Sequence, residues 1–301
     1  MQNDRKSMEK SFGTDLALER RRADPTVEGV TYEREERGDF AVETVSVTTE
    51  AGAERLGKPC GQYVTLTHPP ILYLLGRDRE RLISAVAEEL ERLAAPLCGG
   101  RGKKELTVLV AGLGNRALTS DAIGPLVADR LRATRHLRQA QRALWERLDT
   151  SSLCVCAPGV TAQTGMEASG TVADMAARTG AHLVVVVDAL AARSPERLLR
   201  TVQLCDTGIS PGSGIGNSRE ALDRETVGVP VLAIGVPTVV HTATLVTDAI
   251  GAHSTAELPD EVLDYLERDG FFVSPGDVDQ SVEAIAEILA GAITRLWGVE
   301  E

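Results

Sequence analysis

The sequence predicts an α/β fold, with a doubly wound, mostly parallel sheet and a small N-terminal β-rich subdomain. In the second half of the chain, short all-apolar runs alternate with helical stretches, which is typical of parallel strands buried beneath crossover helices. In the first half, β-branched residues alternate with polar ones, as in a sheet with one face in water. The apolar runs lie at 107–111, 153–156, 182–187 and 229–234, and the alternating segments at 30–32 and 41–47.

Composition narrows the class of protein. The 301 residues are 43% hydrophobic, enough for a sizeable core, and the net charge of −12 lacks the basic footprint that nucleic-acid binding requires. No apolar run approaches the roughly 18 residues of a membrane span. The five cysteines are odd in number and show no C-x-x-C spacing, so neither a disulfide framework nor a zinc site is indicated. We therefore expect a cytoplasmic protein with no nucleic-acid or membrane partner.

Charge predicts the character of the N-terminal segment, and the spacing of apolar residues predicts the helices. Residues 1 to about 27 are charged and aperiodic, which predicts an exposed arm. Apolar residues at helical spacing predict a first long helix at 77–96 and a last one at 277–296. Between them, further helices are predicted at 120–136, 166–179, 238–251 and 259–268.

The first candidate catalytic residue is Asp121. The strand at 107–111 runs into Gly112-Leu113-Gly114-Asn115, and the helix that follows begins near Asp121. A carboxylate in a first helical turn interacts favourably with the helix dipole. The alternative is therefore that Asp121 only stabilises the helix and has no catalytic role. The glycine spacing is also compatible with a dinucleotide-binding loop, but the acidic residue expected about 20 positions later is missing.

The second candidate is Asp188, which ends the apolar run 183–187. Open α/β sheets place their ligand crevice at the carboxyl ends of the strands. A role in capping the next turn is the alternative. If Asp121 and Asp188 lie close together, mutual repulsion raises one pKa, which would provide one acid and one base.

The segment 206–219 predicts a long functional loop over the strand ends, because it contains Gly212, Gly214 and other turn residues. Asp206 opens an Asp-Thr-Gly triplet like that of pepsin-like proteases, but a second triplet is lacking. Gly212-Ser213-Gly214 has the wrong spacing for a serine nucleophile elbow. A phosphate cradle is disfavoured because no Gly-Lys-Ser/Thr follows.

A series of short motifs runs in order along nearly the whole chain. They lie at 14–17, 56–66, 112–115, 121–125, 134–137, 157–160, 164–167, 188–193, 206–217 and 233–240. With these motifs the chain resembles the spore germination proteases, endopeptidases that degrade small acid-soluble spore proteins.

The resemblance implies an atypical aspartic-type endopeptidase of the spore core that is made as a zymogen and assembles as a homotetramer. Its essential aspartates fall on Asp121 and Asp188, and its self-processing point falls between Asp15 and Leu16. The chain then divides into a propeptide at 1–15, an N-terminal part at 16–105 and a catalytic core at 106–301. No cofactor and no metal are implied. Candidate substrate or loop residues are Gly112, Asn115, Asp206, Gly212 and Gly214.

Two departures from the family pattern leave alternatives open. The family usually carries Asp where this chain has His241, and the segment after 252–253 is shorter. A metal held by Asp121, Asp188 and His241 would resemble the hydrogenase-maturation endopeptidases, which have a similar Gly-x-Gly-Asn loop and a related α/β fold. A non-catalytic nucleotide-binding module built on the Gly112 loop is the third hypothesis.

Overall fold

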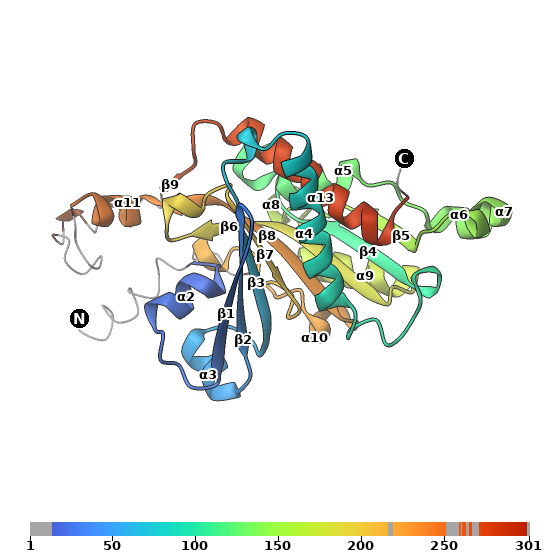
Figure 1. Cartoon of the computed structure of the whole chain (residues 1–301), viewed down its shortest axis with the longest axis horizontal. Helices are drawn as coiled ribbons and strands as arrows, with labels where there is room; N and C mark the ends of the chain where they lie inside the picture. Colours follow the sequence, from blue (N-terminus) through green and yellow to red (C-terminus); the bar gives the residue numbers. More distant parts are fainter. Residues whose placement is uncertain are drawn as a thin grey trace.

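The computed structural model describes residues 14–215, 219–250, 259, 261–262, 265–266 and 271–299. They form a nine-stranded sheet with helices on both faces (Figure 1). The strand order is β1-β2-β3-β7-β8-β6-β4-β5, and β9 pairs with β8. The strands are β1 Val30–Arg37, β2 Phe40–Val47, β3 Gly61–Thr67, β4 Thr107–Gly112, β5 Ser152–Cys156, β6 Leu183–Ala192, β7 Thr201–Cys205, β8 Val231–His241 and β9 Phe272–Val273.

The predicted α/β class is confirmed, but the expectation of a mostly parallel sheet is wrong. Only β8, β6, β4 and β5 run parallel to their neighbours in that order. The strand β7, which the apolar runs did not indicate, returns antiparallel to β8 and also pairs antiparallel with β3. Through β7 the N-terminal strands β1 to β3 join the same sheet, which is therefore mixed.

Two helical layers cover the sheet. One face packs against α4, α5 and α13 around a large apolar core, and the other packs against α2, α3, α9 and α10 (Figure 1). The helices are α2 Ala17–Ala23, α3 Glu50–Leu56, α4 Arg77–Ala94, α5 Ile123–Arg130, α6 Arg135–Ala140, α7 Arg142–Arg147, α8 Thr161–Thr164, α9 Ala168–Thr179, α10 Arg224–Val227, α11 Thr242–Ala249 and α13 Val278–Trp297.

Several predicted helices have different bounds. The helix expected at 120–136 ends at Arg130 and is followed by the short α6 and α7. The helix expected from 238 begins only at Thr242, because β8 continues to His241 and pairs Val239 and Val240 with the end of β6. Most of the helix expected at 259–268 lies outside the described residues, as do the first thirteen residues of the expected propeptide.

The expectation of an exposed N-terminal arm is wrong for residues 14–18. Leu16, Ala17 and Leu18 are fully buried, and Asp15 is 7% exposed. Ala17 and Leu18 insert into the apolar cluster beneath β2 and β3, and α2 begins there. The apolar stretch is only three residues long and is flanked by charges, so periodicity alone could not separate it from the surrounding arm.

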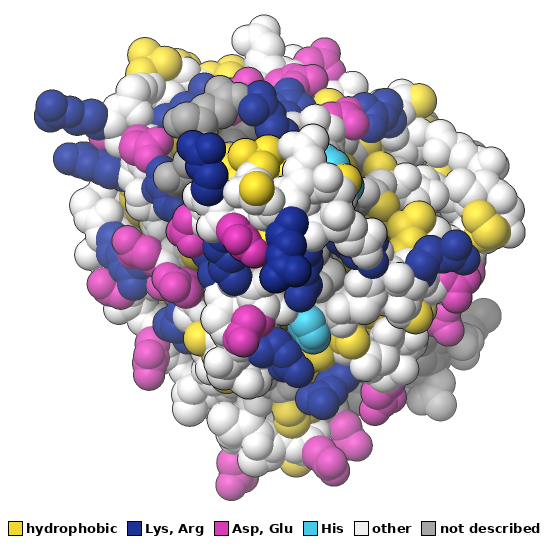
Figure 2. Space-filling model, turned by 90° about the vertical axis from the view of Figure 1, so that its right-hand side faces the viewer, with side chains coloured by type: hydrophobic (Ala, Val, Ile, Leu, Met, Phe, Trp, Pro, Cys, Tyr) yellow, Lys and Arg dark blue, Asp and Glu magenta, His cyan; other side chains and the backbone are white. Residues whose placement is uncertain are grey.

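The surface carries both signs of charge. On the face shown in Figure 2, basic and acidic side chains are interspersed rather than gathered into a single-sign field. Within the part of the chain that the structure describes, no helix combines the length and apolar character needed to cross a bilayer.

The start of α5 packs against the ends of β4 and β6 through two glycines. A Cβ on Gly112 would lie 2.0 Å from the carbonyl oxygen of Gly124, and a Cβ on Gly124 would lie 2.2 Å from that of Leu113 and 2.5 Å from that of Val187. These contacts are backbone to backbone and cannot be relieved by a side-chain rotation. They bring the segment that carries Asp121 directly against the strand that carries Asp188.

We predict that Gly124→Ala destabilises the protein by about 1–3 kcal/mol, because the added methyl group overpacks this contact. Gly170→Ala is the matched control. Gly170 lies in α9, and a Cβ there would meet no atom within 4 Å, so alanine should stabilise the helix by roughly 0.5–1 kcal/mol. Urea unfolding of the two variants measures both changes, and equal effects would contradict the packing argument.

Candidate active site

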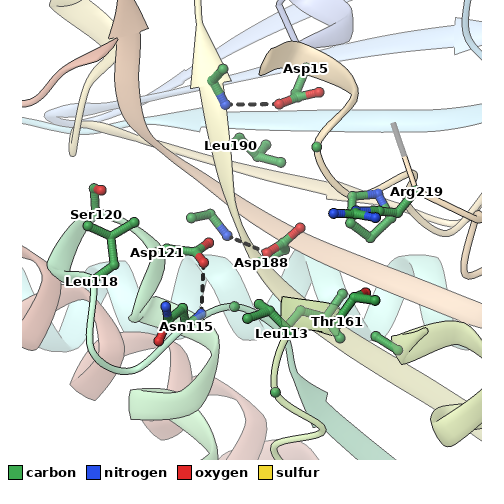
Figure 3. Close-up of a pocket in the computed structure, with 18 of the residues that line it drawn as sticks. Asp15, Leu113, Asn115, Leu118, Ser120, Asp121, Thr161, Asp188, Leu190 and Arg219 are labelled. Atoms are coloured by element: carbon green, nitrogen blue, oxygen red, sulfur yellow. Dashed lines mark hydrogen bonds between the residues drawn. The ribbon is translucent and has the colours of Figure 1, made fainter. Parts of the chain in front are cut away.

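A cleft opens at the carboxyl ends of β4 and β6 and contains both predicted carboxylates (Figure 3). The glycine loop after β4 forms one wall, and residues 211–212 and 219–222 with the start of α9 form another. Figure 3 shows Asp121 and Asp188 pointing into the same space from opposite sides. The structure thus brings together two residues that are far apart in sequence.

Asp121 is the last residue of a 3-10 turn, Thr119–Asp121, that precedes α5. Its Oδ2 accepts a hydrogen bond of 2.8 Å from the backbone N–H of Asn115. Burial raises the pKa of Asp121, and the hydrogen bond from Asn115 partly opposes that shift by favouring the ionised form. The carboxyl group of Asp121 therefore has a hydrogen-bond donor that stabilises its ionised form.

Asp188 lies on β6 one residue beyond the end of its pairing with β4, which stops at Gly112 and Val187. It is 5% exposed, and its Oδ1 accepts a hydrogen bond of 3.0 Å from the N–H of Ala189. Burial raises the pKa of Asp188 well above its usual value, and the negative charges of Asp121 and Asp15 raise it further. The neutral, protonated form of Asp188 is thus strongly favoured.

The two carboxyl groups have different environments, and this difference shifts their pKa values to different extents. Both pKa values are raised, but Asp188 is the more deeply buried and is also raised by the charge of Asp121. When like charges share a site, one proton is retained by the group whose charged form is least stabilised. Burial and mutual repulsion therefore favour the neutral form more strongly at Asp188 than at Asp121.

The backbone of the glycine loop after β4 already contacts other residues of the protein. A Cβ on Gly114 would lie 2.0 Å from the carbonyl oxygen of Asp121, and Gly112 packs on Gly124. The N–H of Asn115, which would face a phosphate in a nucleotide-binding loop, donates to Asp121 instead. The side-chain oxygen of Asn115 accepts from Gln163 at 2.7 Å. This geometry does not favour the nucleotide-binding hypothesis.

The structure places the other predicted loop residues in different positions. Gly212 lines the cleft, whereas Gly214 lies against Asp15, whose Oδ2 would be 2.3 Å from a Cβ on Gly214. Asp206 lies apart from the cleft at the end of β7. Its Oδ1 accepts a hydrogen bond of 2.8 Å from the N–H of Gln62, and burial raises its pKa. Asp206 therefore joins two strand ends.

His241 does not lie with the two aspartates in the way the metal hypothesis requires. Its Nδ1 accepts from the N–H of Ala243 at 3.1 Å and caps α11, and its ring stands edge-on to Phe272 with the centroids 5.0 Å apart. No histidine is among the described residues that line the cleft. Within the described ranges, no group of three or more His, Cys, Asp and Glu side chains is arranged to hold a metal ion.

Sequence reasoning missed several residues around the cleft. Asp15 was expected only as a cleavage point, yet it lines the cleft together with Asp121 and Asp188. Ser213 and Gln203 contact the backbone or side chain of Asp15. The glycines on both sides of Ser213 were a signal for a close approach at this loop, but they did not identify what approaches it.

Two carboxyl groups of raised pKa in a cleft at the carboxyl ends of parallel strands are the arrangement expected of an acid–base site in an α/β protein. Comparison with known families makes the class specific. The family model described as germination protease matches residues 10–256. The chain belongs to the germination protease family, and this membership indicates a protease that acts in germination.

Individual relatives agree with the family model. A germination protease of Clostridium perfringens is 35% identical over 93% of this chain and 93% of its own length. Those of Caldanaerobacter subterraneus and Bacillus subtilis are 40% and 38% identical, each over 79% of this chain and over 72% and 65% of their own lengths. Among solved structures, a NiFe hydrogenase maturation protease from Thermococcus kodakarensis matches 68% of this chain and 99% of its own, at 19% identity and a TM-score of 0.37.

The raised pKa of Asp188 predicts a pH-dependent cost to stability. An acid whose folded pKa exceeds its unfolded value of 3.8 destabilises the fold increasingly as pH rises from that value to the folded pKa, and by a constant amount above it. Asp188→Asn removes the ionisation, so the variant should be more stable than the unaltered chain at pH 8 by about 1–3 kcal/mol. The gain should vanish near pH 4. Urea unfolding at the two pH values measures it, and a gain independent of pH would contradict the assignment.

Proposed function

We propose that this chain is a self-processing endopeptidase that begins the degradation of small acid-soluble spore proteins during germination, with Asp121 and Asp188 activating a water molecule. The observation that carries the proposal is the carboxyl pair itself, two buried groups of raised pKa that line one cleft at the strand ends. The germination protease family membership supports the same activity.

The proposed chemistry needs only the two aspartates and water. The ionised Asp121 takes a proton from the water as its oxygen attacks the peptide carbonyl carbon. The protonated Asp188 donates its proton to the carbonyl oxygen, which forms a tetrahedral intermediate. As the C–N bond breaks, Asp121 passes the proton it took from water to the leaving amine, and Asp188 recovers a proton from a hydroxyl of the intermediate, so both groups return to their starting states. The hydrogen bond from Asn115 holds the Asp121 carboxylate in place throughout. This division of roles follows from burial, because Asp188 holds its proton more tightly.

The N-terminal arm supports the proposal that the chain is a zymogen. Asp15 lies in the cleft with both carboxyl groups, so the bond between Asp15 and Leu16 is close to the proposed catalytic pair. Asp15 pairs with Ala191, three residues beyond Asp188 on β6. At roughly 3.3 Å per strand residue, the bond therefore sits about 10 Å along the strand from Asp188. The arm must shift before this bond can be cut.

The segment Asp15-Leu16-Ala17 suggests the class of substrate. An acidic, a large apolar and a small residue in succession are the pattern expected at the sites cut in the spore proteins. We propose that removal of residues 1–15 yields the mature enzyme, that the chain assembles as a homotetramer, and that it works in the spore core. The shortened segment after residue 252 lies outside the described residues.

We predict that the purified full-length chain, incubated at mildly acidic pH, acquires a new N-terminus at Leu16. Asp121→Asn and Asp188→Asn should each reduce the rate of this cleavage by at least about 1,000-fold, because either change removes one of two groups that act as a unit. N-terminal sequencing and intact-mass analysis over time measure the rate.

Asp174→Asn is the matched control, because Asp174 is exposed on α9 and is not among the residues that line the cleft. This variant should be processed at the rate of the unaltered chain. Processing that persists in the Asp121→Asn, Asp188→Asn double variant would rule out the carboxyl pair as the catalytic group.

A further inference from the structure

One oxygen of the Asp121 carboxyl group is left for water. Oδ2 accepts the hydrogen bond of 2.8 Å from the N–H of Asn115, whereas Oδ1 accepts none from the residues that the structure describes. Asp121 is half-buried and lines the cleft, so a water molecule in the cleft reaches Oδ1. A general base must hold the group whose proton it takes within hydrogen-bond distance. The water that attacks the peptide therefore belongs on Oδ1.

The side-chain amide of Asn115 is held in one orientation. Its Oδ1 accepts from the N–H of Ala117 at 3.0 Å and from Nε2 of Gln163 at 2.7 Å. A backbone N–H only donates, so the end of the amide that faces Ala117 is the oxygen. Because the amide is planar, two donors on its oxygen also fix the direction of its nitrogen. Figure 3 shows this nitrogen on the side of Asp121 and the oxygen on the far side.

The amide nitrogen of Asn115 has no acceptor within the described part of the chain. It carries two N–H donors, and Asn115 is half-buried in the lining of the cleft. The backbone of the same residue is bonded to Asp121. A donor without a protein partner and an oxygen without a protein donor thus lie on residues that are joined by a hydrogen bond.

Other donors of the cleft are less well placed to hold a water on Asp121. The hydroxyl of Thr161 donates to Glu167 at 3.1 Å, and the guanidinium of Arg219 forms an ion pair with the same carboxylate at 3.6 Å. Figure 3 shows the hydroxyl of Ser120 turned away from Asp121. The amide of Asn115 is the better candidate because it is both adjacent to Asp121 and oriented.

We propose that Asn115 is a catalytic residue that holds the attacking water, and that Gln163 is the positioning residue that aims its amide. Nδ2 of Asn115 donates to the water oxygen, and the water donates one hydrogen to Oδ1 of Asp121. The remaining lone pair of the water oxygen faces the peptide carbonyl carbon. The proposal rests on the proposed endopeptidase function and deepens it by adding a third residue to the reaction.

The amide contributes orientation and takes no part in proton transfer. As the new C–O bond forms, one O–H bond of the water breaks and Asp121 takes the proton, while the amide keeps both of its hydrogens. A water with a single hydrogen bond to a carboxylate can rotate about it, whereas a second hydrogen bond fixes the lone pair on its target. Misplacing a reacting atom by about 1 Å costs roughly 100-fold in rate.

The test compares two substitutions of Asn115 in the full-length chain. Asn115→Ala removes the whole amide, whereas Asn115→Asp keeps the oxygen that Ala117 and Gln163 bind and removes only the donor. Both leave the backbone N–H that binds Asp121. Each should lower the rate of self-processing by about 100-fold. Once processed, each should cleave a peptide with the sequence of residues 11–20 with kcat about 100-fold lower and KM nearly unchanged, because the amide contacts water and not the peptide.

The pH profile separates loss of the donor from the effect of the added charge. If Asn115→Asp acts only by raising the pKa of Asp121, its profile moves along the pH axis and keeps its maximum. Loss of the donor lowers the maximum itself. A processing rate of Asn115→Asp that reaches the unaltered maximum at any pH would overturn the proposal.

Gln163→Ala tests the positioning role. It should slow processing by about ten-fold, since Ala117 still binds the amide oxygen, and it should have no further effect once Asn115→Ala is present. Equal effects of Gln163→Ala with and without the amide would contradict a role through Asn115. Arg116→Ala is the matched control, because Arg116 follows Asn115 on the same loop, pairs with Asp129 on the surface and does not line the cleft. Its processing rate should be unaltered.

Failure of the water-holding role and failure of the proposed function give different results. If the Asp121→Asn, Asp188→Asn chain is still processed, the carboxyl pair fails and the role of Asn115 fails with it. If processing requires both aspartates but runs at the unaltered rate in Asn115→Ala, the role of Asn115 fails alone.

Discussion

The site depends on the overhang of β6 beyond β4. The strand β4 ends at Gly112, where the backbone must turn to let α5 approach, whereas β6 continues for five more residues beside β8. The overhang places Asp188 one residue beyond the part of β6 that pairs with β4. It also supplies the edge on which the N-terminal arm lies. Both the buried acid and its occupied cleft follow from two neighbouring strands of unequal length.

Placing a carboxyl group at that point has an energetic consequence. Asp188 gains one hydrogen bond, from its neighbour Ala189, and faces two negative charges, so its ionised form is poorly stabilised. The surrounding apolar core must offset that cost. The strand segment before Asp188 contributes to that offset, because Val185 and Val187 are fully buried within the larger apolar cluster. The fold thus tolerates the repulsion between the two carboxyl groups because the strand that carries Asp188 is well packed.

Sequence patterns predicted what depends on local chemistry. Apolar runs located β4, β5, β6 and β8. The end of one run located Asp188, and the glycine loop and helix start that follow another run located Asp121. The patterns did not reveal β7, because its five residues alternate polar and apolar side chains although all of them are buried. Without β7 the antiparallel half of the sheet could not be joined to the parallel half. Asp15 was equally hidden, since only tertiary contacts with Ala191 and Ser213 distinguish it from the other acidic residues of a charged segment.

The carboxylate of Asp15 acts on the cleft at a distance as well as by contact. Its negative charge is one of the causes that raise the pKa of Asp188. When the arm departs, that charge leaves and water gains access to the strand edge, and both changes make Asp188 easier to ionise. Loss of the arm would therefore do more than clear space for a substrate. It would also lower the pKa of Asp188 toward its ordinary value.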